Sequence, residues 1–365
     1  MKSGNCRTFF KLHIMKILII TLSGIGDALM FTPALKLLRK ALPEAKIDAL
    51  VMYGGAKEIY ESNRNFNKVI HFNFLEKGVV KSLKFLFQLR KKYDASVNVY
   101  PSNRKEYNLI NYLIGAKKRV GVVYLRKNRT NLGFLNNIKV LENDNVHNAV
   151  TNIKLCEALI GKKFNEEPPL EFPISDEERK KAAKFFEDKG ISSDELVVGF
   201  HPGCATLKNH IKRRWEPEKF AELGKKLIND YKARILIFGG PEEKDLKDQI
   251  STLINSDRVT VINAESLTKS SSIMQCCNIF VTNDSSQMHI ASAIGLKVVA
   301  IIGPTNQNYI HPWKTEYQIV SLNLDCSPCF FYSPTPLICH RTDVKFKCIK
   351  ELTVEMVYDS IKKYL

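Results

Sequence analysis

Short apolar runs alternate with amphipathic segments along this chain, and the pattern occurs twice, which limits the fold more than any other feature. The strand-like runs are Lys16–Leu22, Lys46–Met52, Lys68–Phe72, Ala95–Val99 and Lys118–Val123 in the first half, and Leu196–Phe200, Arg234–Phe238, Val259–Ile262, Ile279–Thr282 and Val298–Ile302 in the second. Between them, apolar residues recur at helical steps of three and four, for example Ala28, Phe31, Leu35, Leu38 and Leu42. Strands that alternate with helices predict an α/β protein with parallel sheets.

A proline-rich break separates the two halves. Glu166-Glu167-Pro168-Pro169, followed by Pro173, interrupts the alternation, which restarts with a helical segment at Asp176. Proline lacks a backbone donor and restricts the residue before it, so such a cluster is typical of a linker. We predict two Rossmann-like domains, at residues 15–165 and 179–350, joined by a linker at 166–178 and followed by a C-terminal helix at 351–365. A chain of 365 residues is long enough for two such cores.

The N-terminus and the length of the apolar runs bear on location. Residues 1–14 are basic and mildly apolar, too short for a secretory signal, and precede a second methionine, Met15. We interpret them as an N-terminal extension. No run reaches the roughly 18–20 apolar residues that span a bilayer. The chain is therefore expected to be cytoplasmic.

The net charge is strongly positive. Lys and Arg number 55 against 38 Asp and Glu, which gives a formal charge of +17. Such an excess favours an anionic partner, either nucleic acid, anionic lipid or a phosphorylated substrate. A basic proteome would give the same excess, and the lysines are spread along the chain. The charge alone therefore does not select a partner.

The first segment whose residues could take part in binding or catalysis is the turn Ser23-Gly24-Ile25-Gly26-Asp27, between the first strand and its helix. Glycines there allow close approach to a ligand, and the following helix N-terminus favours anions. A dinucleotide fingerprint is disfavoured because Leu29 stands where its third Gly or Ala is needed. Asp27 would repel a pyrophosphate, but it could accept a proton from a hydroxyl. The alternative is an aspartate that only caps the helix.

The second segment follows the first strand of the second half. It contains a glycine turn and a run of cations, namely Gly203, Lys208, Lys212, Arg213 and Arg214. Arg binds phosphate oxygens in a bidentate fork, so this segment is a candidate diphosphate clamp. The alternative is a solvated basic loop, which the neighbouring Trp215 disfavours because it indicates an anchored segment.

Two further strand ends carry polar residues. Glu242 and Glu243 begin a helix after Gly239-Gly240-Pro241. A carboxylate there could bind ribose hydroxyls, or it could be present only because the helix dipole favours acids at a helix start. The turn Asn283-Asp284-Ser285-Ser286 begins another helix and offers free backbone N–H groups to phosphate. Its candidate donor-binding residues are Asp284, Ser285, Ser286 and His289. His289 falls on the second helical turn, where a lone histidine more often packs than takes part in catalysis.

Four cysteines near the C-terminus allow three interpretations. Their order is Cys326-x2-Cys329-x9-Cys339-x8-Cys348, with a single closely spaced pair. Four thiolates could hold a structural zinc ion, the thiols could be free and buried, or two could form a disulfide. Four thiolate ligands would leave no open position, so a catalytic metal is not expected.

Together these segments resemble glycosyltransferase family 9, the ADP-heptose:lipopolysaccharide heptosyltransferases. The resemblance runs from Met15 through nearly the whole chain, and its motifs occur in the family's order. They are Ile20-Thr21-Leu22-Ser23-Gly24-Ile25-Gly26-Asp27 with Thr32-Pro33-Ala34-Leu35, then His201-Pro202-Gly203, Arg213-Arg214-Trp215-Glu216-Pro217, Asn283-Asp284-Ser285-Ser286-x-x-His289 and Gly303-Pro304-Thr305. The family implies a GT-B fold, in which two facing Rossmann-like domains enclose a cleft, the first for the acceptor and the second for an ADP-sugar.

The resemblance also implies an inverting transfer that needs no metal. Asp27 would deprotonate the acceptor hydroxyl, with Ser23, Gly24 and Gly26 in the same acceptor-side loop. A cation two positions before Trp215 would neutralise the departing diphosphate. The family usually has Lys there, whereas this chain has Arg213 with Lys212 beside it, so either could act.

The remaining implied roles concern the donor and the acceptor. The backbone at Asp284, Ser285 and Ser286 would receive the donor phosphates, and Ser286 replaces the family's common Gly. Glu243 or Glu242 would bind the ribose. The acceptor would be an anionic glycolipid such as the lipopolysaccharide core, and the basic charge suits peripheral contact with the inner face of the cytoplasmic membrane.

Three other functions compete with this prediction. An NAD-dependent oxidoreductase would explain two Rossmann-like halves, but it requires the three-glycine fingerprint. An RNA-binding protein would explain the charge, but no motif combines aromatics with Arg and Lys, so nucleic acid is not an expected partner. A family member with another donor sugar or acceptor is also consistent with this sequence.

Overall fold

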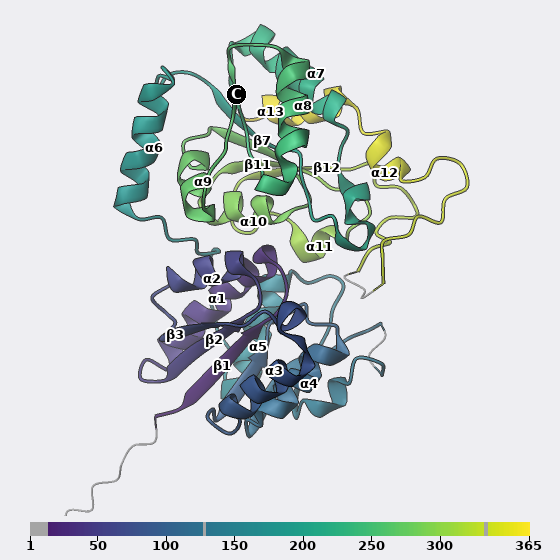
Figure 1. Cartoon of the computed structure of the whole chain (residues 1–365). Coiled ribbons are helices and arrows are strands. Elements are labelled where there is room, and N and C mark those ends of the chain that lie inside the picture. Colours follow the sequence, from purple (N-terminus) through teal and green to yellow (C-terminus); the bar gives the residue numbers. More distant parts are fainter. Residues whose placement is uncertain (1–13, 127–128, 332–334) are drawn as a thin grey trace, which may run out of the picture.

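The computed structural model describes residues 14–126, 129–331 and 335–365, which form two domains stacked along the long axis of the molecule (Figure 1). The first domain has one parallel six-stranded sheet in the order β3-β2-β1-β4-β5-β6. Its strands are β1 Lys16–Thr21, β2 Lys46–Val51, β3 Lys68–His71, β4 Ala95–Asn98, β5 Lys118–Val123 and β6 Ile138–Leu141. Its helices are α1 Ile25–Ala41, α2 Gly54–Glu61, α3 Phe74–Leu89, α4 Lys105–Ile114 and α5 Asn148–Ile160, with a short 3-10 turn at Gly133–Leu135.

The second domain repeats this topology with the parallel sheet β12-β11-β10-β7-β8-β9. Its strands are β7 Val197–His201, β8 Arg234–Ile237, β9 Val259–Val261, β10 Ile279–Asn283, β11 Lys297–Ile301 and β12 Tyr317–Val320. Its helices are α6 Asp176–Asp188, α7 Pro217–Tyr231, α8 Lys244–Ile254, α9 Leu267–Met274, α10 Ser286–Ala293, α11 Gln307–Ile310, α12 Lys347–Lys350 and α13 Val354–Lys362. Two 3-10 segments, Leu207–Arg213 and Pro241–Glu243, follow β7 and β8. In chain order both sheets have the doubly wound arrangement that places ligands at the carboxyl ends of the strands.

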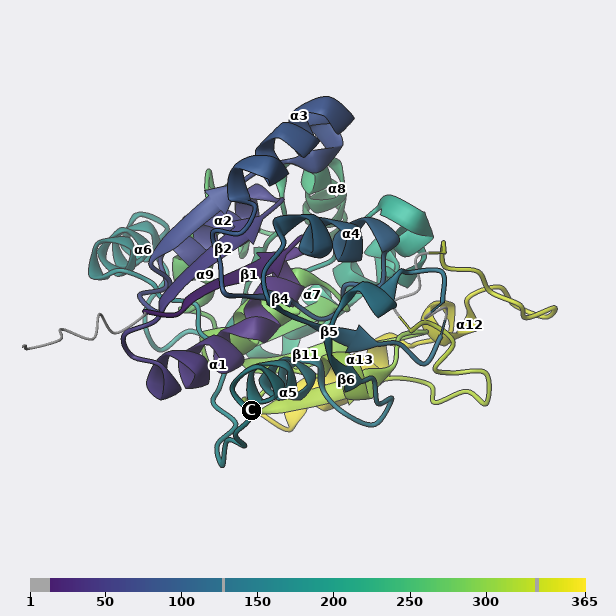
Figure 2. The ribbon, with the colours of Figure 1, turned by 90° about the horizontal axis from the view of Figure 1, so that it is seen from below.

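The apolar core explains how the two domains are held together. Helices α3 and α4 cover one face of the first sheet, and α7, α8 and α13 cover one face of the second. The other two faces belong to a single cluster that continues from α1 and α5 in the first domain to α9 and α10 in the second. Figures 1 and 2 show α1 and α2 lying against these helices of the second domain. The α1 helix is therefore buried along most of its length.

Polar contacts add to this interface. Glu58 in α2 accepts hydrogen bonds from the backbone N–H of Leu267 and of Thr268 at the start of α9, at 3.2 and 2.6 Å. On the other side, the Asp144 carboxylate accepts from the Tyr309 hydroxyl, and the His147 ring stacks on Trp313 with centroids 4.5 Å apart. These contacts hold the carboxyl ends of the two sheets facing each other.

The predicted linker bridges both domains. The Pro168 carbonyl accepts from the Trp313 indole at 2.9 Å, and the Glu171 amide donates to the Thr32 hydroxyl at 2.8 Å. Helix α6 begins at Asp176, inside the range predicted as linker, because Ser175 caps it and three acids fill its first turn. The C-terminal helix α13 packs in the second core rather than standing apart. In the described part of the chain, no helix is both long enough and apolar enough to cross a membrane.

Candidate active site

Asp27 lies at the third position of α1, directly after β1, where the domains meet. Its carboxylate accepts a hydrogen bond at 3.1 Å from the amide of Gly24, which is the N-cap residue, so Asp27 supports the helix start from the third position and is not itself the N-cap. The residue keeps partial contact with solvent. The surrounding protein raises the pKa of this carboxyl group to about 7, because burial disfavours the charged form, and the Gly24 hydrogen bond opposes the shift only in part. A carboxylate with this pKa is suited to accept a proton near neutral pH.

The acceptor-side turn packs directly on the second domain. Ser23 and Gly26 are half-buried and Gly24 is exposed. A Cβ atom at Gly26 would lie 2.7 Å from His289 Cδ2 in α10, so only glycine allows this approach without movement. Burial lowers the pKa of His289 to about 4, and the imidazole is therefore neutral. Within the described residues its Nδ1 has no hydrogen-bond partner.

A buried ion pair faces Asp27 from the second domain. The Arg213 guanidinium donates to Asp284 Oδ2, and both side chains are almost fully buried, at 7% and 6% exposure. The same carboxylate oxygen accepts from the Thr305 hydroxyl at 2.6 Å. Among the smaller influences on Asp27, the Asp284 charge raises its pKa and the Arg213 charge lowers it. The pair is therefore close enough to act electrostatically on the candidate base.

The other predicted cations lie elsewhere. Lys212 is exposed, whereas its neighbour Arg213 points into the interface. Arg214 donates to the Cys204 carbonyl at 2.9 Å and to Glu243 at 3.3 Å. Lys208 is half-buried, and its pKa is lowered by burial and by the positive charge of Arg104 in the first domain. Of the four cations, Arg213 is the one in the ion pair that faces Asp27.

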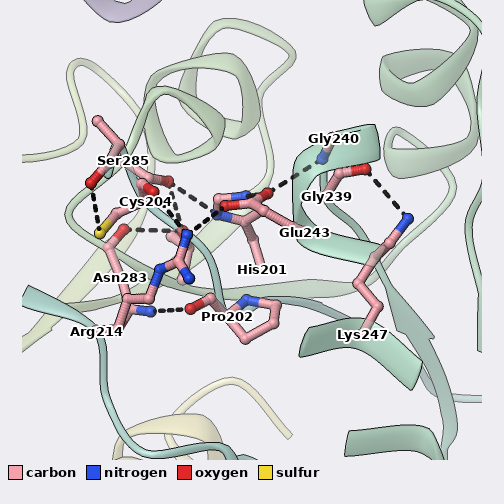
Figure 3. A network of polar contacts seen from close by, with 12 residues as sticks. His201, Pro202, Cys204, Arg214, Gly239, Gly240, Glu243, Lys247, Asn283 and Ser285 are labelled. Carbon is pink, nitrogen blue, oxygen red and sulfur yellow. Dashed lines mark hydrogen bonds and ion pairs between the residues drawn. The ribbon is translucent and has the colours of Figure 1, made fainter. Parts of the chain in front are cut away.

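Glu243 is the centre of the polar network in Figure 3. Its Oε2 lies 3.2 Å from His201 Nε2 and accepts from the Gly240 amide at 3.1 Å. Burial opposes ionisation, but the His201 contact and these other partners lower the pKa of Glu243 overall. A Cβ atom at Gly203 would lie 1.6 Å from Glu243 Oε1, so the carboxylate occupies the space that a larger residue would need. Glu242, by contrast, is exposed.

The turn before α10 is tied to the same network. Ser285 is the N-cap residue of α10, and its hydroxyl lies 3.0 Å from His201 Nδ1 (Figure 3). Because the Glu243 carboxylate can only accept, His201 donates from Nε2, and Nδ1 accepts from Ser285. Ser286 begins α10 and is half-buried. The first free N–H groups of this helix thus lie beside the Arg213–Asp284 pair.

Several residues of this region were not predicted as site residues. Asn283 donates to the Pro202 carbonyl at 2.7 Å and accepts from the Trp215 amide at 3.0 Å, so it holds together the two segments that flank Arg213. Thr305 was recognised only as part of the motif Gly303-Pro304-Thr305, without a role of its own. Lys247 is 1% exposed, and its ammonium group donates to the Ile262 carbonyl at 2.8 Å. The available signal for Lys247 was its place on the apolar face of α8, in register with Ile250 and Ile254.

The C-terminal cysteines give no support to the predicted zinc site. Cys326 and Cys329 are exposed, Cys339 is partly buried and Cys348 is buried, and all four thiols are free. In residues 14–126, 129–331 and 335–365, no three His, Cys, Asp or Glu side chains are grouped so that they could hold a metal ion.

Comparisons with known proteins show the family of this chain. The family description "Glycosyltransferase family 9 (heptosyltransferase)" matches residues 83–335, more than half of the chain. A lipooligosaccharide heptosyltransferase 2 of Campylobacter jejuni serotype O:2 is 25% identical over 358 residues, covering 96% of this chain and 98% of that protein. The protein of the same name from serotype O:6 is 31% identical over 185 residues, which are 49% of this chain and 55% of that protein.

A solved structure supports the fold. The structure of E. coli ADP-heptose LPS heptosyltransferase II has a TM-score of 0.72 and 21% identity, covering 96% of this chain and 98% of that chain. At this identity the likeness concerns the fold alone. The GT-B architecture predicted from the sequence is confirmed.

Proposed function

The chain belongs to glycosyltransferase family 9, the heptosyltransferases, and from this we propose that it transfers a heptose or a related sugar from an ADP-sugar to a lipopolysaccharide core or similar glycolipid. The two lipooligosaccharide heptosyltransferase 2 proteins of Campylobacter jejuni, one of them similar over 96% of this chain, support the choice of a heptose and of a lipopolysaccharide-type acceptor. The transfer would invert the anomeric configuration and need no metal. It would take place at the inner surface of the cytoplasmic membrane.

The observation that carries the proposal is the position of Asp27 opposite the Arg213–Asp284 pair. A single displacement needs a base beside the acceptor hydroxyl and positive charge beside the leaving group. Asp27 takes the hydroxyl proton while the acceptor oxygen bonds to the anomeric carbon. The bond from that carbon to the diphosphate breaks, and the electron pair leaves on the phosphate oxygen, where Arg213 stabilises the charge. Asp284 holds the Arg213 guanidinium group in place, and the Thr305 hydroxyl in turn holds the Asp284 carboxylate.

The same proposal assigns the donor-binding residues. The diphosphate would bind the N–H groups at Ser285 and Ser286 and the turn at Gly203, with Lys208 and Arg214 at its edge. We assign the ribose hydroxyls to Glu242, because Glu243 is already bonded to His201 and Gly240. His289 would form a neutral wall of the site next to the acceptor-side turn of Ser23, Gly24 and Gly26.

The substitution Asp27→Asn tests the base. Asn keeps the size of the side chain but cannot take the proton, so transfer should fall by at least about 10²-fold, as is typical for removal of a general base. Binding of ADP, measured by calorimetry, should stay within about threefold of wild type, because the donor contacts lie in the other domain. A variant that retained more than about a tenth of the wild-type rate would exclude Asp27 as the base.

Two controls separate this function from its alternatives. Thermal stabilisation by ADP, UDP, GDP and NAD distinguishes a transferase from an oxidoreductase. Stabilisation by NAD and by none of the nucleoside diphosphates would overturn the proposal. Transfer should also persist in the presence of EDTA, and its loss on chelation with recovery on metal addition would contradict the metal-independent mechanism.

A further inference from the structure

Helix α3 exposes an apolar surface that nothing in the described structure covers. Its inner face packs against the first domain: Leu86 and Leu89 are buried against the sheet, and Phe85 stacks on Phe72 with ring centroids 4.0 Å apart. Outside this face, five large apolar residues remain exposed: Leu75 at 67%, Val79 at 75%, Val80 at 81%, Leu83 at 39% and Phe87 at 61%. Contiguous apolar surface of this kind marks an interaction site.

The exposed apolar residues form a stripe along the helix. The helix is broken at Gly78, whose φ is 71°; after this break Val79, Val80, Leu83 and Phe87 recur at steps of three and four, so they lie on one side, next to the buried face. Leu109 and Tyr112 of the adjacent helix α4 are also exposed, at 42% and 47%. Figure 2 shows α3 at the outer edge of the first domain, with α4 beside it. The stripe is therefore accessible to a large flat partner.

The charges around the stripe indicate what this partner is. Residues 74–92 contain six cations, Lys77, Lys81, Lys84, Arg90, Lys91 and Lys92, against a single acid, Glu76. Within the described residues, Lys77, Lys81 and Lys84 form no ion pair, and all three are exposed. Apolar side chains flanked by lysines on one helix are typical of helices that lie in the interface of an anionic bilayer.

The topology places the start of this helix at the same edge of the sheet as the candidate base. Helix α3 begins at the carboxyl end of β3, and Asp27 follows the carboxyl end of β1 in the same parallel sheet. In a parallel sheet these ends lie at one edge. A protein docked through α3 would thus hold the first domain, which carries the acceptor-side turn, against the membrane.

We propose that α3 docks the protein on anionic membranes, with Val80, Leu83 and Phe87 entering the interface and Lys77, Lys81 and Lys84 contacting lipid phosphates. This deepens the proposed function, because it names the surface that brings the enzyme to a lipid-linked acceptor. The lysines attract the protein to the surface, and the apolar stripe retains it there.

Vesicle sedimentation tests the proposal without reference to catalysis. Wild-type protein should bind vesicles of phosphatidylglycerol and phosphatidylcholine at least about tenfold more tightly than phosphatidylcholine alone, and less tightly at high salt. The triple variant V80Q/L83Q/F87Q should lose tenfold or more, since Gln keeps the helix but removes the apolar groups. The variant K77Q/K81Q/K84Q should lose the preference for phosphatidylglycerol and the salt dependence.

The matched control replaces three other exposed apolar residues, all in the second domain. The variant L253Q/I338Q/L365Q changes residues that are 38%, 58% and 50% exposed, and it should bind vesicles as wild type does. Circular dichroism and thermal unfolding verify that all variants fold. Wild-type vesicle binding by V80Q/L83Q/F87Q would overturn the proposal. The proposal would also be overturned if light scattering showed that wild type is a dimer and V80Q/L83Q/F87Q is a monomer, and if neither protein bound vesicles.

A transfer assay separates this inference from the proposed function. With an acceptor that lacks acyl chains, V80Q/L83Q/F87Q should transfer at the wild-type rate, whereas with acceptor embedded in vesicles its rate should fall about tenfold. Equal rates of variant and wild type on embedded acceptor would contradict the docking role. Absence of transfer by every protein would refute the proposed function and leave the vesicle result to decide the docking surface by itself.

Discussion

At the scale of single residues, Asp27 combines a structural contact with a proposed chemical role. The hydrogen bond at the helix start and the proposed base are compatible, because the Gly24 amide binds one carboxylate oxygen while burial raises the pKa of the whole group. A helix N-terminus and a backbone hydrogen bond would by themselves favour the charged form. Burial outweighs both, and the charge of Asp284 in the facing domain adds a smaller upward shift of the pKa.

This predicts the pH dependence of transfer. The base must be unprotonated, and its pKa is about 7. The value of kcat/KM should therefore rise about tenfold per pH unit below pH 7 and level off above it. An aspartate with an ordinary pKa near 4 would give a flat profile from about pH 5.5 to 8. Measurement across this range with a slow-reacting donor decides between them, and a flat profile would contradict the raised pKa.

The same shift makes a prediction for stability. A carboxyl group whose pKa is higher in the folded state binds its proton more tightly when folded, so the free energy of unfolding should fall as pH rises from about 4 to about 7. Above pH 7 this contribution should be constant. Asp27→Asn removes this titrating group. The unfolding free energy of the variant minus that of wild type should therefore increase as pH rises over this window. Urea unfolding at pH 5 and 8 measures it, and an unchanged difference would exclude the linkage.

Residues whose role depends on distant neighbours were the hardest to predict. The motif around Arg213 was readable because Arg, Trp and Pro occur together in the sequence. The sequence could not show which of Lys212 and Arg213 pairs with Asp284, because Asp284 lies 71 positions away in the chain. Lys247 was missed for the same reason, since only the fold shows that three oxygen atoms surround its ammonium group.

At the scale of elements, the sequence predicted ten of the strands, and the two that were missed are both edge strands. β6 (Ile138–Leu141) and β12 (Tyr317–Val320) each have only one neighbour in their sheets. Their residues are half-buried or exposed along most of the strand, so they lack the continuous apolar run that marks a central parallel strand. Central strands are buried on both faces, which is why the same pattern located them within about one residue.

The turns after β7 and β8 depend on one glycine. Gly203→Ala would place a methyl group 1.6 Å from Glu243 Oε1, in a carboxylate that His201, Arg214 and Gly240 hold. Overpacking of this kind costs about 1–3 kcal/mol, so we expect a loss of that size in unfolding free energy and weaker ADP binding. Gly54→Ala is the control, because a methyl group there meets nothing within 4 Å. Equal stability of the two variants in urea would contradict this account.

At the scale of the whole molecule, the proposed catalysis requires both domains, because each carries only half of the proposed chemistry. Asp27 belongs to the first domain, and Arg213, Asp284 and the helix start at Ser285 belong to the second. The continuous apolar core and the contact of Gly26 with His289 describe an arrangement in which these halves are already together. Under the proposed function, substrates that bind between the two surfaces would require the domains to separate and close again, and the interface contacts would then be part of the reaction cycle.

Glu58 tests this coupling, since it links α2 of the first domain to the start of α9 in the second. It accepts from two backbone amides and from the Thr268 hydroxyl, and hydrogen bonds to a charged group contribute about 1.5–3 kcal/mol. Glu58→Ala should favour separated domains, so X-ray scattering should show a larger radius of gyration and the KM for the donor should rise about tenfold. Glu61→Ala is the matched control on the same helix, because Glu61 is exposed and pairs only with Lys57, at 3.7 Å, among the described ion pairs. If Glu58→Ala matched the control in both scattering and KM, the α2–α9 contact would have no part in bringing Asp27 to the donor.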